Sequence, residues 1–504
     1  MKLVIKNALI YDGSGAKPFA GTVVCVDGII KLCTKENPTV PADYVFDAKG
    51  LALAPGFIDA HSHSDMSILA APEATGKISQ GITTEIIGNC GLSVYPITKY
   101  NHEHLQELYR NYDVDISWTD LNGYKAELAR RNPAVDLVPL AGHNTLRASL
   151  CGYAKHQLTT SESSELQNSL AQCFEQGAQG FSSGLLYVPG KFADAKELTG
   201  FLKTVAQYDK IYTTHLRSEG KKLSEALIET FDAVLRSGLR RLHISHLKVA
   251  GATNWHKINE LFSLLQAAKA QGIELSADRY PYTESMTQLS VILPEPYDDM
   301  NDVNLEKTLQ NEDDYNKIKA ALSALPATRW QTARLVFAKG YEKFCGQTFE
   351  FIAKAEKCDP ALLCAEILRA DATGALAAFQ GMSEDNMTRI IQQDFVTCGS
   401  DESARPLDYS IGRSHPRGFG SMPRFCNILC QNGFSLEKAI QRITSLPAQI
   451  FRLAGKGLIK EGFVADLVLF DPKNFKNTAT FAKPHQVSEG IHKVWRKSKV
   501  IYSK

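Results

Sequence analysis

Eight short apolar runs that alternate with amphipathic stretches predict an α/β protein built on a (β/α)₈, TIM-like barrel. Each run has the length of a strand, and helical periodicity follows most of them, as in 164–176 and 223–236. Glycines such as Gly177 and Gly238 stand just past the ends of these stretches, where helices commonly stop. The runs lie at 52–58, 83–87, 135–140, 178–182, 211–214, 241–245, 274–277 and 395–398.

The two ends of the chain predict a second, smaller domain. Both 1–54 and 457–504 contain short β-branched runs separated by Asp-Gly and other turn sequences. We therefore expect these two segments to form one β-sandwich, beside a barrel of residues 55–456. The connection between the seventh and eighth runs is far longer than the others, so 290–376 is predicted to be a helical insertion that serves as a lid.

Composition excludes several classes of protein. The chain has 504 residues, of which 44% are hydrophobic and 22% charged, as in ordinary globular proteins. Lys and Arg total 56 against 55 Asp and Glu, which favours neither nucleic acid nor an anionic membrane as a partner. No apolar run approaches the length of about 20 residues that a membrane helix needs. Eleven scattered cysteines without CxxC pairs predict a cytoplasmic protein.

The residues that close the predicted strands indicate a metal site. In a parallel barrel, catalytic groups lie where the strands end. His61 and His63 alternate along one strand and therefore face the same direction, so they can share a cation. Together the strand ends collect five of the thirteen histidines, a cysteine and an aspartate. These residues are His61, His63, Cys90, His143, His215, His246 and Asp401.

Imidazole and thiolate ligands suit zinc, and Asp401 would serve as base and acid beside it. Taken singly, each residue has a plainer interpretation: a lone histidine is more often a structural hydrogen-bonding group, and Cys90 alone would be a small buried side chain. His243 lies on the opposite strand face from His246, and we predict a structural role for it. His102 and His104 repeat the HxH spacing in a polar helical stretch, which predicts surface residues.

Longer motifs resemble a known family. The segment Pro55-Gly-Phe-Ile-Asp-Ala-His61-Ser-His63 resembles the signature of the amidohydrolase superfamily, and 457–468 resembles the strand-forming end of its members. A further set of motifs, in family order, resembles the N-acyl-D-amino-acid deacylase (D-aminoacylase) family. These motifs are Gly81 to Gly91, Thr214 to Glu219, Ser245 to Lys248, Tyr280-Pro-Tyr282, Gly399-Ser-Asp401 and His415-Pro-Arg417.

This resemblance implies a role for each matching position. Cys90, His215 and His246 match one tight zinc site, whereas His61 and His63 with Asp401 match a second, weaker metal position. The cysteine stands where many relatives have a carboxylated lysine, and the fourth run contains no lysine. Asp401 matches the catalytic acid and base. The substrate-site candidates are Arg417, Lys248, Tyr282, Ser285, His143 and Asn144, with Arg405 and Arg413 as rivals of Arg417 for the substrate carboxylate.

The implied activity is zinc-dependent hydrolysis of the amide bond of N-acyl-D-amino acids, giving a carboxylate and a free D-amino acid. A dipeptidase or a cyclic-amide hydrolase (hydantoinase- or dihydroorotase-like) on the same barrel is the main alternative, and a non-catalytic oligomeric scaffold is a weaker one. Residues that clamp a carboxylate distinguish the first activity, because simple cyclic amides need none. The sequence leaves open the acyl and side-chain preference, the number of metals and the oligomeric state.

Overall fold

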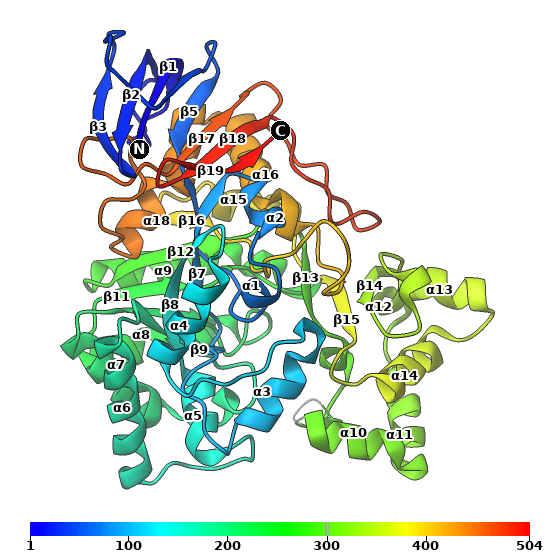
Figure 1. The fold of residues 1–504 in the computed structure, drawn as a ribbon. Coiled ribbons are helices and arrows are strands. Elements are labelled where there is room, and N and C mark those ends of the chain that lie inside the picture. The colour runs from blue at the N-terminus through cyan, green and yellow to red at the C-terminus, as the bar shows by residue number, and fades with distance from the viewer. Residues whose placement is uncertain (298–299, 301) are drawn as a thin grey trace.

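A barrel of eight parallel strands forms the centre of the computed structural model, which describes residues 1–297, 300 and 302–504 (Figure 1). Its strands follow one another in chain order and close between the first and the last, where the Ala60 amide donates to the Cys398 carbonyl at 3.1 Å. The predicted barrel is thus confirmed. The strands are β6 (Phe57–Asp59), β7 (Ile82–Ile87), β8 (Asp136–Gly142), β9 (Gly180–Gly184), β10 (Ile211–His215), β11 (Arg241–Ile244), β12 (Glu274–Arg279) and β16 (Val396–Cys398).

The first predicted strand, 52–58, is in fact two strands that belong to different sheets. β5 (Ala52–Pro55) pairs with strands from the chain ends, and β6 begins the barrel. The switch occurs at Gly56, whose amide donates to Asp466 in the terminal sheet, while the next amide donates to Gly81 before β7. A Cβ at Gly56 would lie 2.1 Å from Thr83 Oγ1, so only glycine fits at this crossing.

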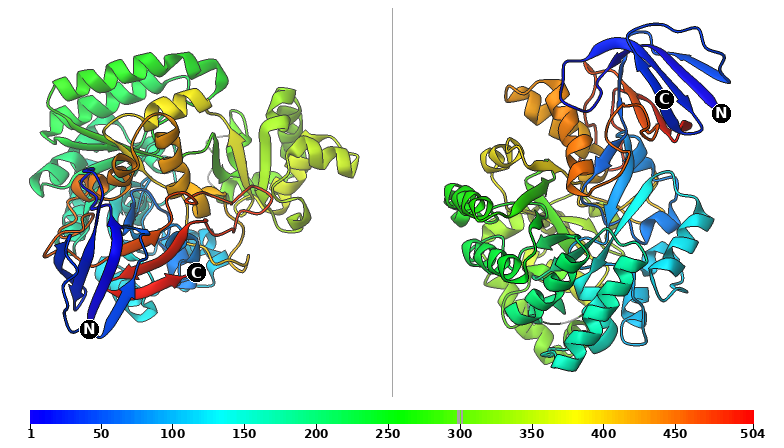
Figure 2. Two further views of the ribbon diagram at one scale, coloured as in Figure 1. Left: turned by 90° about the horizontal axis from the view of Figure 1, so that it is seen from above. Right: turned by 90° about the vertical axis from the view of Figure 1, so that its left-hand side faces the viewer.

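Both chain ends contribute to one hydrogen-bonded sheet, as Figure 2 shows beside the barrel. β17 pairs with β5 and thereby joins the last strands of the chain to the first ones. A buried apolar cluster that includes Ile5, Leu53 and Trp495 packs against this sheet, and β1 alone buries Leu3, Val4 and Ile5 in succession. The remaining strands are β1 (Lys2–Ile10), β2 (Phe19–Val26), β3 (Ile29–Thr34), β4 (Tyr44–Asp47), β17 (Leu467–Phe470), β18 (Ile491–Arg496) and β19 (Lys499–Ser503).

Amphipathic helices surround the barrel. α8, for example, buries Leu227, Phe231 and Val234 at helical spacing and ends at Gly238, whose φ of 78° gives the left-handed stop. A capping box between Thr159 and Glu162 starts α6. Within the described residues, no helix combines the length and apolar character needed to cross a membrane. The main helices are α4 (Leu121–Arg131), α5 (His143–Cys151), α6 (Thr160–Glu175), α7 (Ala195–Gln207), α8 (Leu223–Ser237), α9 (Ile258–Ala270), α15 (Glu384–Ile391), α16 (Arg417–Gln431) and α17 (Leu436–Ile443).

An insertion lies between β12 and β16 and projects to one side of the barrel (Figure 1). It has its own apolar core, which includes Ile318, Trp330 and Phe349. The sequence predicted a helical insertion, but a three-stranded antiparallel sheet connects it to the barrel. Its elements are β13 (Glu284–Gln288), α10 (Asp302–Gln310), α11 (Glu312–Ser323), α12 (Ala327–Thr332), β14 (Ala333–Phe337), α13 (Phe349–Glu356), α14 (Pro360–Ala370) and β15 (Leu376–Gln380).

Candidate metal centre

Side chains from the ends of four barrel strands converge on one point. The Cys90 Sγ atom after β7 lies 3.4 Å from His61 Nε2 and 3.4 Å from His246 Nε2. One carboxylate oxygen of Asp401, just after β16, is 3.4 Å from His61 Nε2 and 3.2 Å from His63 Nε2. The ligand atoms of His61, Cys90, His246 and Asp401 all lie within 4.8 Å of one another. The strand-end pattern therefore produces a compact donor set.

His215, the last residue of β10, extends this set. Its ring lies 4.4 Å from the His246 ring, measured between centroids, and its Nε2 is 3.6 Å from Glu219 Oε2. Both ring nitrogens are buried and have no hydrogen-bond partner among the described residues. A buried imidazole is rarely left without partners, because desolvation of its nitrogens is costly. The two nitrogens are therefore available to bind a metal ion.

The donors fit zinc. Burial raises the pKa of the Cys90 thiol, but the facing His61 and His246 outweigh that effect and bring the pKa well below its usual value. A thiolate among imidazoles and a carboxylate matches the preference of zinc for nitrogen and sulfur ligands, with oxygen at the remaining position.

The backbone at this centre is held in unfavourable conformations. Cys90, His246 and Asp401 have φ values of 54°, 36° and 52°, in the left-handed region that non-glycine residues rarely occupy. Local hydrogen bonds hold two of them: the Asp401 amide donates to the His61 carbonyl at 2.8 Å, and the His246 amide donates to Asp278 Oδ1 at 3.0 Å. Strain of this kind concentrates at functional sites.

Asp278 on β12 organises two of the histidines. Its Oδ2 lies 3.1 Å from His61 Nδ1 and 3.0 Å from His243 Nε2, while Oδ1 accepts the His246 amide. Burial acts to raise the pKa of Asp278, but His61 and His243 together lower it far below the usual value. The contact of Asp278 with His61 Nδ1 orients the ring so that Nε2 faces Cys90. The position of His243 agrees with the structural role that we predicted.

Two cationic side chains flank the donor set. Arg417, the first residue of α16, places Nη1 2.8 Å from Asp401 Oδ2. Lys248 Nζ lies 2.6 Å from Glu219 Oε1 and 2.7 Å from His246 Nδ1. Both cations are buried, so each is partnered by a carboxylate, as buried charges require.

Comparison with known proteins gives the family. The amidohydrolase family profile matches residues 44–186 and 367–502. An N-acyl-D-aspartate deacylase of Alcaligenes xylosoxydans xylosoxydans is 31% identical over 99% of this chain and 91% of its own length. A D-aminoacylase of the same organism is 30% identical over 89% of this chain and 84% of its own.

The chain belongs to the D-aminoacylase family of amidohydrolases. An N-acyl-D-glutamate deacylase of Bordetella bronchiseptica, solved with zinc and a phosphonate that mimics the tetrahedral intermediate, superposes with a TM-score of 0.83. It is 29% identical, and the match covers 99% of this chain and 96% of that one. A D-aminoacylase studied for its binuclear metal centre superposes with a TM-score of 0.82 at 27% identity, over 100% of this chain and 96% of the other.

Three arginines were rivals for the substrate carboxylate of this amidohydrolase, and the structure separates them. Arg417 alone of the three forms an ion pair with Asp401 in the described residues. Arg405 donates to the Ile411 carbonyl and to the Tyr112 hydroxyl, and Arg413 donates to the Ala482 carbonyl at 3.0 Å. Of these three arginines, Arg417 is therefore the one with a described contact to a candidate metal donor.

Of the other substrate-site candidates, Tyr282 lies beside Arg417, whereas Ser285 does not. Tyr282 packs 5.1 Å from the His415 ring, and its hydroxyl reaches the Pro416 carbonyl beside Arg417. Ser285 lies on β13, where its hydroxyl donates to the Phe379 carbonyl at 3.5 Å. Its described contacts belong to the small sheet of the insertion.

His143 and Asn144, at the start of α5, contact residues around the site and none of the candidate metal donors in the described contacts. The described contacts of His143 are to Glu197, at 2.9 Å, and to the rings of Phe181 and Phe201, rather than to a metal donor. Asn144 donates to the carbonyls of Gly184 and Tyr187 and thus holds the turn after β9.

Three residues that the sequence analysis gave no role adjoin the centre: Asp278, Glu219 and Tyr187. Tyr187 packs edge-on against His215, with ring centroids 4.9 Å apart. Asp278 lies near the end of β12, and Glu219 follows His215 by four residues in the loop after β10. The rule that strand ends carry function could have found Asp278, because this rule had already found the histidines.

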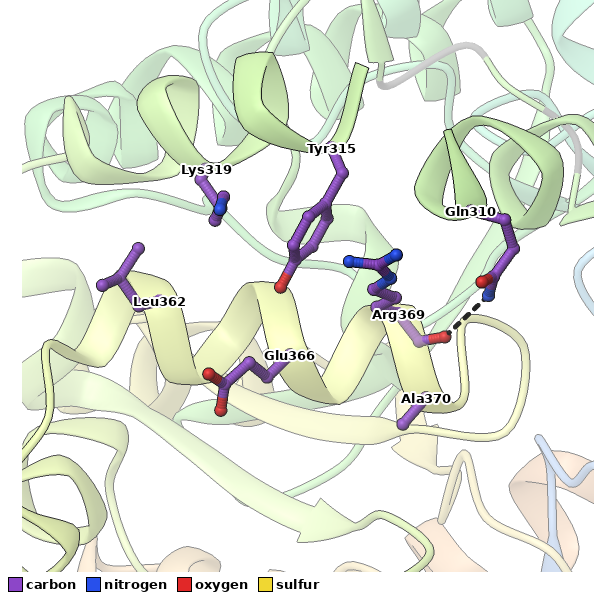
Figure 3. A pocket seen from close by; sticks show the side chains of 7 residues that line it. All are labelled: Gln310, Tyr315, Lys319, Leu362, Glu366, Arg369 and Ala370. Atoms are coloured by element: carbon purple, nitrogen blue, oxygen red, sulfur yellow. Dashed lines mark hydrogen bonds between the residues drawn. The ribbon is translucent and has the colours of Figure 1, made fainter. Parts of the chain in front are cut away.

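A separate cavity of about 490 Å³ lies within the insertion, between α10, α11 and α14 (Figure 3). Arg369 stacks on Tyr315 there, with its guanidinium carbon 4.4 Å from the ring centroid, and also pairs with Glu312. The cavity shares no residue with the metal cluster and contains no group of metal donors in the described part of the chain.

Proposed function

We propose that this protein hydrolyses the amide bond of N-acyl-D-amino acids with the help of zinc, releasing a carboxylate and a free D-amino acid. One observation carries the proposal: the carboxylate of Asp401 has one oxygen against His61 and His63 and the other against Arg417. Asp401, the proposed proton-transfer group, thus lies between two candidate metal donors and Arg417, whose charge suits a substrate carboxylate.

Cys90, His215 and His246 would hold the tightly bound zinc, and His61 and His63 with Asp401 a second, weaker metal. When bound, zinc supplies a Lewis acid that polarises the acyl carbonyl and acidifies water. The family relatives solved with zinc or with a binuclear centre support this assignment.

Asp401 would accept a proton from the attacking water and then deliver it to the departing amine. Burial acts to raise the pKa of Asp401, but Arg417 and the surrounding histidines keep it well below its usual value. The carboxylate is therefore ionised at neutral pH and starts the reaction as a base. Its place beside His63 puts it within reach of a water held at the metal donors.

Arg417 and Lys248 would hold the α-carboxylate of the substrate. Both now pair with protein carboxylates, so binding would exchange one partner for another of the same charge. The planar fork of Arg417 can meet a carboxylate through two parallel hydrogen bonds. With carboxylate and acyl carbonyl both fixed, the two configurations at Cα would direct the side chain differently, and this is the basis that we propose for D selectivity.

Tyr187 is suited to bind the acyl oxygen. Burial raises the pKa of its phenol well above the ordinary value, and nearby Cys90 and Glu219 raise it further. The hydroxyl therefore stays protonated and can donate to an oxygen that gains negative charge. We infer this role from the contact between Tyr187 and His215.

A cyclic-amide hydrolase on the same barrel would have no use for two cations beside the proton-transfer group, because its substrates need no carboxylate clamp. The pairing of Lys248 and Arg417 with Glu219 and Asp401 therefore favours linear N-acyl amino acids.

The decisive experiment compares hydrolysis of N-acetyl-D- and N-acetyl-L-amino acids, with zinc quantified in the same preparation. We expect activity on D substrates only, in proportion to the zinc content. Turnover of L substrates alone would reject the stereochemical part of the proposal, and turnover of hydantoins with none of either series would favour a cyclic-amide hydrolase.

A further inference from the structure

A loop of the terminal β domain reaches the segment of the barrel that carries Arg417. This loop, which we name the strap, consists of residues 471–490 between β17 and β18. In Figures 1 and 2 it leaves the terminal sheet and extends toward the insertion. An antiparallel bridge joins Lys476 to Glu489, and their side chains form an ion pair of 3.0 Å. The base of the strap is therefore closed, and the strap is an ordered ribbon.

The strap is fixed to α16 and to the loop before this helix. Ser488 Oγ donates to the Phe419 carbonyl at 2.8 Å, in the first turn of α16. His485 stacks on the Phe419 ring, with centroids 4.8 Å apart, and its Nδ1 donates to the Asp408 carbonyl at 2.8 Å. The strap thus packs on both ends of the segment 408–419, which contains Arg417.

Phe481, near the tip of the strap, packs against a buried histidine. Its ring lies 4.7 Å from the His415 ring, measured between centroids, at an interplanar angle of 80°. The guanidinium carbon of Arg334, on β14 of the insertion, lies 4.8 Å from the centroid of the Phe481 ring. Arg413 donates to the neighbouring Ala482 carbonyl, but this bond is exposed and its loss should move the ring little. The terminal domain, the insertion and the barrel therefore meet at Phe481.

His415 connects Phe481 with the substrate site. Its Nδ1 accepts the backbone amide of Arg417 at 3.0 Å, so the ring is neutral and carries its proton on Nε2. Nε2 is buried and has no hydrogen-bond partner among the described residues. Besides the bond to Arg417, packing against the rings of Phe481 and Tyr282 is therefore what fixes the orientation of this imidazole.

These contacts form a route from the strap to the site of the substrate carboxylate. The Arg417 amide is one of the first amides of α16, which have no partner inside the helix, and His415 supplies that partner. The guanidinium of the same arginine lies 2.8 Å from Asp401 Oδ2. If the imidazole turned, the first turn of α16 would lose this bond and the guanidinium would lose its fixed position. Small displacements of a group that positions the substrate are costly.

We propose that Phe481 is a positioning residue for substrate binding: it holds the His415 ring, and through this ring Arg417, in the geometry that receives the α-carboxylate. This role rests on that of Arg417 in the proposed function. It gives the terminal β domain a part in substrate affinity, although that domain lies outside the barrel. The plainer alternative is that Phe481 only stabilises the strap.

Phe481→Ala removes the ring and keeps the backbone of the strap. With N-acetyl-D-amino acids as substrates, we expect KM to rise by about 3- to 10-fold, as the loss of an aromatic contact predicts, and kcat to change by less than about 2-fold. Phe481→Tyr keeps the ring and should restore the wild-type KM. Phe481→Leu keeps much of the apolar volume without the ring, so it should also raise KM and serves if the smaller side chain prevents folding.

Phe475→Leu is the matched control. It removes another ring of the strap, which packs on Phe470 in a buried apolar cluster, with centroids 5.3 Å apart. We expect this variant to unfold at a lower denaturant concentration and to keep the wild-type KM. Combination of Phe481→Ala with Arg417→Ala tests the route, because a residue that acts through Arg417 should add no further increase in KM to Arg417→Ala.

The outcomes separate this inference from the proposed function. An unchanged KM in folded Phe481→Ala or Phe481→Leu would overturn the inference and leave the deacylase assignment intact. A KM increase of the same size on the Arg417→Ala background would overturn it too, because Phe481 would then act on another group. Absence of hydrolysis for every N-acyl-D-amino acid by the wild type would overturn both.

Discussion

Two clusters of buried polar side chains lie close together at the mouth of the barrel, and they are built in opposite ways. The metal cluster consists of Cys90 with its surrounding histidines and Asp401. The second, which we name the lysine cluster, consists of Lys77, Asp59, Glu85, Ser62 and Ser400. Both draw on the ends of β6, β7 and β16, so the same strands support both.

The lysine cluster satisfies most of its groups through contacts within the cluster, and Glu85 Oε1 is the exception among its described side-chain atoms. Lys77 Nζ lies 2.8 Å from Asp59 Oδ2, 3.2 Å from Glu85 Oε2 and 2.9 Å from Ser400 Oγ. It also donates to the carbonyl of Glu402, next to Asp401. Burial lowers the pKa of Lys77, but Asp59 and Glu85 outweigh it and raise the pKa above its ordinary value. The one cation of this cluster thus contacts both of its carboxylates.

The metal cluster leaves comparable groups without partners. His215 has two orphaned nitrogens, and three residues of the cluster have left-handed backbone conformations. The comparison teaches that burial and charge alone do not mark a functional site. A cluster whose charged groups pair mainly with one another serves stability, and one whose donor atoms converge without partners serves chemistry. Four substitutions test this distinction.

Cys90→Ala should have the largest effect on function. Removal of the thiolate that faces both His61 and His246 should abolish stoichiometric zinc and reduce kcat/KM by about 10⁴-fold or more, given the share of catalysis that a metal supplies. Zinc analysis and steady-state kinetics provide the measurements. Cys364→Ala, at a buried cysteine in the core of the insertion, is the control and should retain zinc. Full zinc occupancy in Cys90→Ala would remove this residue from the centre.

Asp401→Asn should separate metal binding from proton transfer. The amide cannot accept a proton, so kcat should fall by about 10³-fold, within the range for general acid–base catalysis. Zinc should still bind, because the proposed ligands Cys90, His215 and His246 are unchanged. Near-normal turnover in a zinc-loaded Asp401→Asn preparation would contradict the role that we give to this carboxylate.

Lys77→Met should affect stability more than chemistry. It leaves Asp59 and Glu85 buried without a cation, and breaking a buried pair in this way costs about 3–5 kcal/mol. Denaturant unfolding should show this loss, whereas Lys438→Met, at an exposed lysine, should change little. If Lys77→Met unfolded like the wild type, the lysine cluster would not be the structural element described above.

Arg417→Ala should have the smallest of the four effects. Loss of charge-assisted hydrogen bonds worth about 1.5–3 kcal/mol should raise KM by about 10- to 100-fold and change kcat less. Arg413→Ala serves as the control, because Arg413 donates to the Ala482 carbonyl instead. An unchanged KM in Arg417→Ala would return Arg405 and Arg413 as candidates for the carboxylate anchor.

Much of the site could be predicted because it follows from position along single strands. His61, Cys90, His215, His246 and Asp401 each close an apolar run, and the structure brings them together. His143 satisfies the same rule, yet its described contacts are structural. The rule identifies the mouth of the barrel, but it does not say which side chains at the mouth turn toward the centre.

By itself, the sequence predicted the barrel, a β domain that both chain ends form, and the types of side chain that gather at the strand ends. The periodicity of buried residues and the positions of strand ends depend on residues that are near one another in the chain, so a single segment is enough to predict them. Only the tertiary structure decided which donors stay unpaired. Asp278 holds His61 across 217 residues of sequence, and Arg279 lacks the carboxylate that Lys248 and Arg417 each have. Such pairing depends on distances between remote segments, and these distances exist only once the barrel has closed.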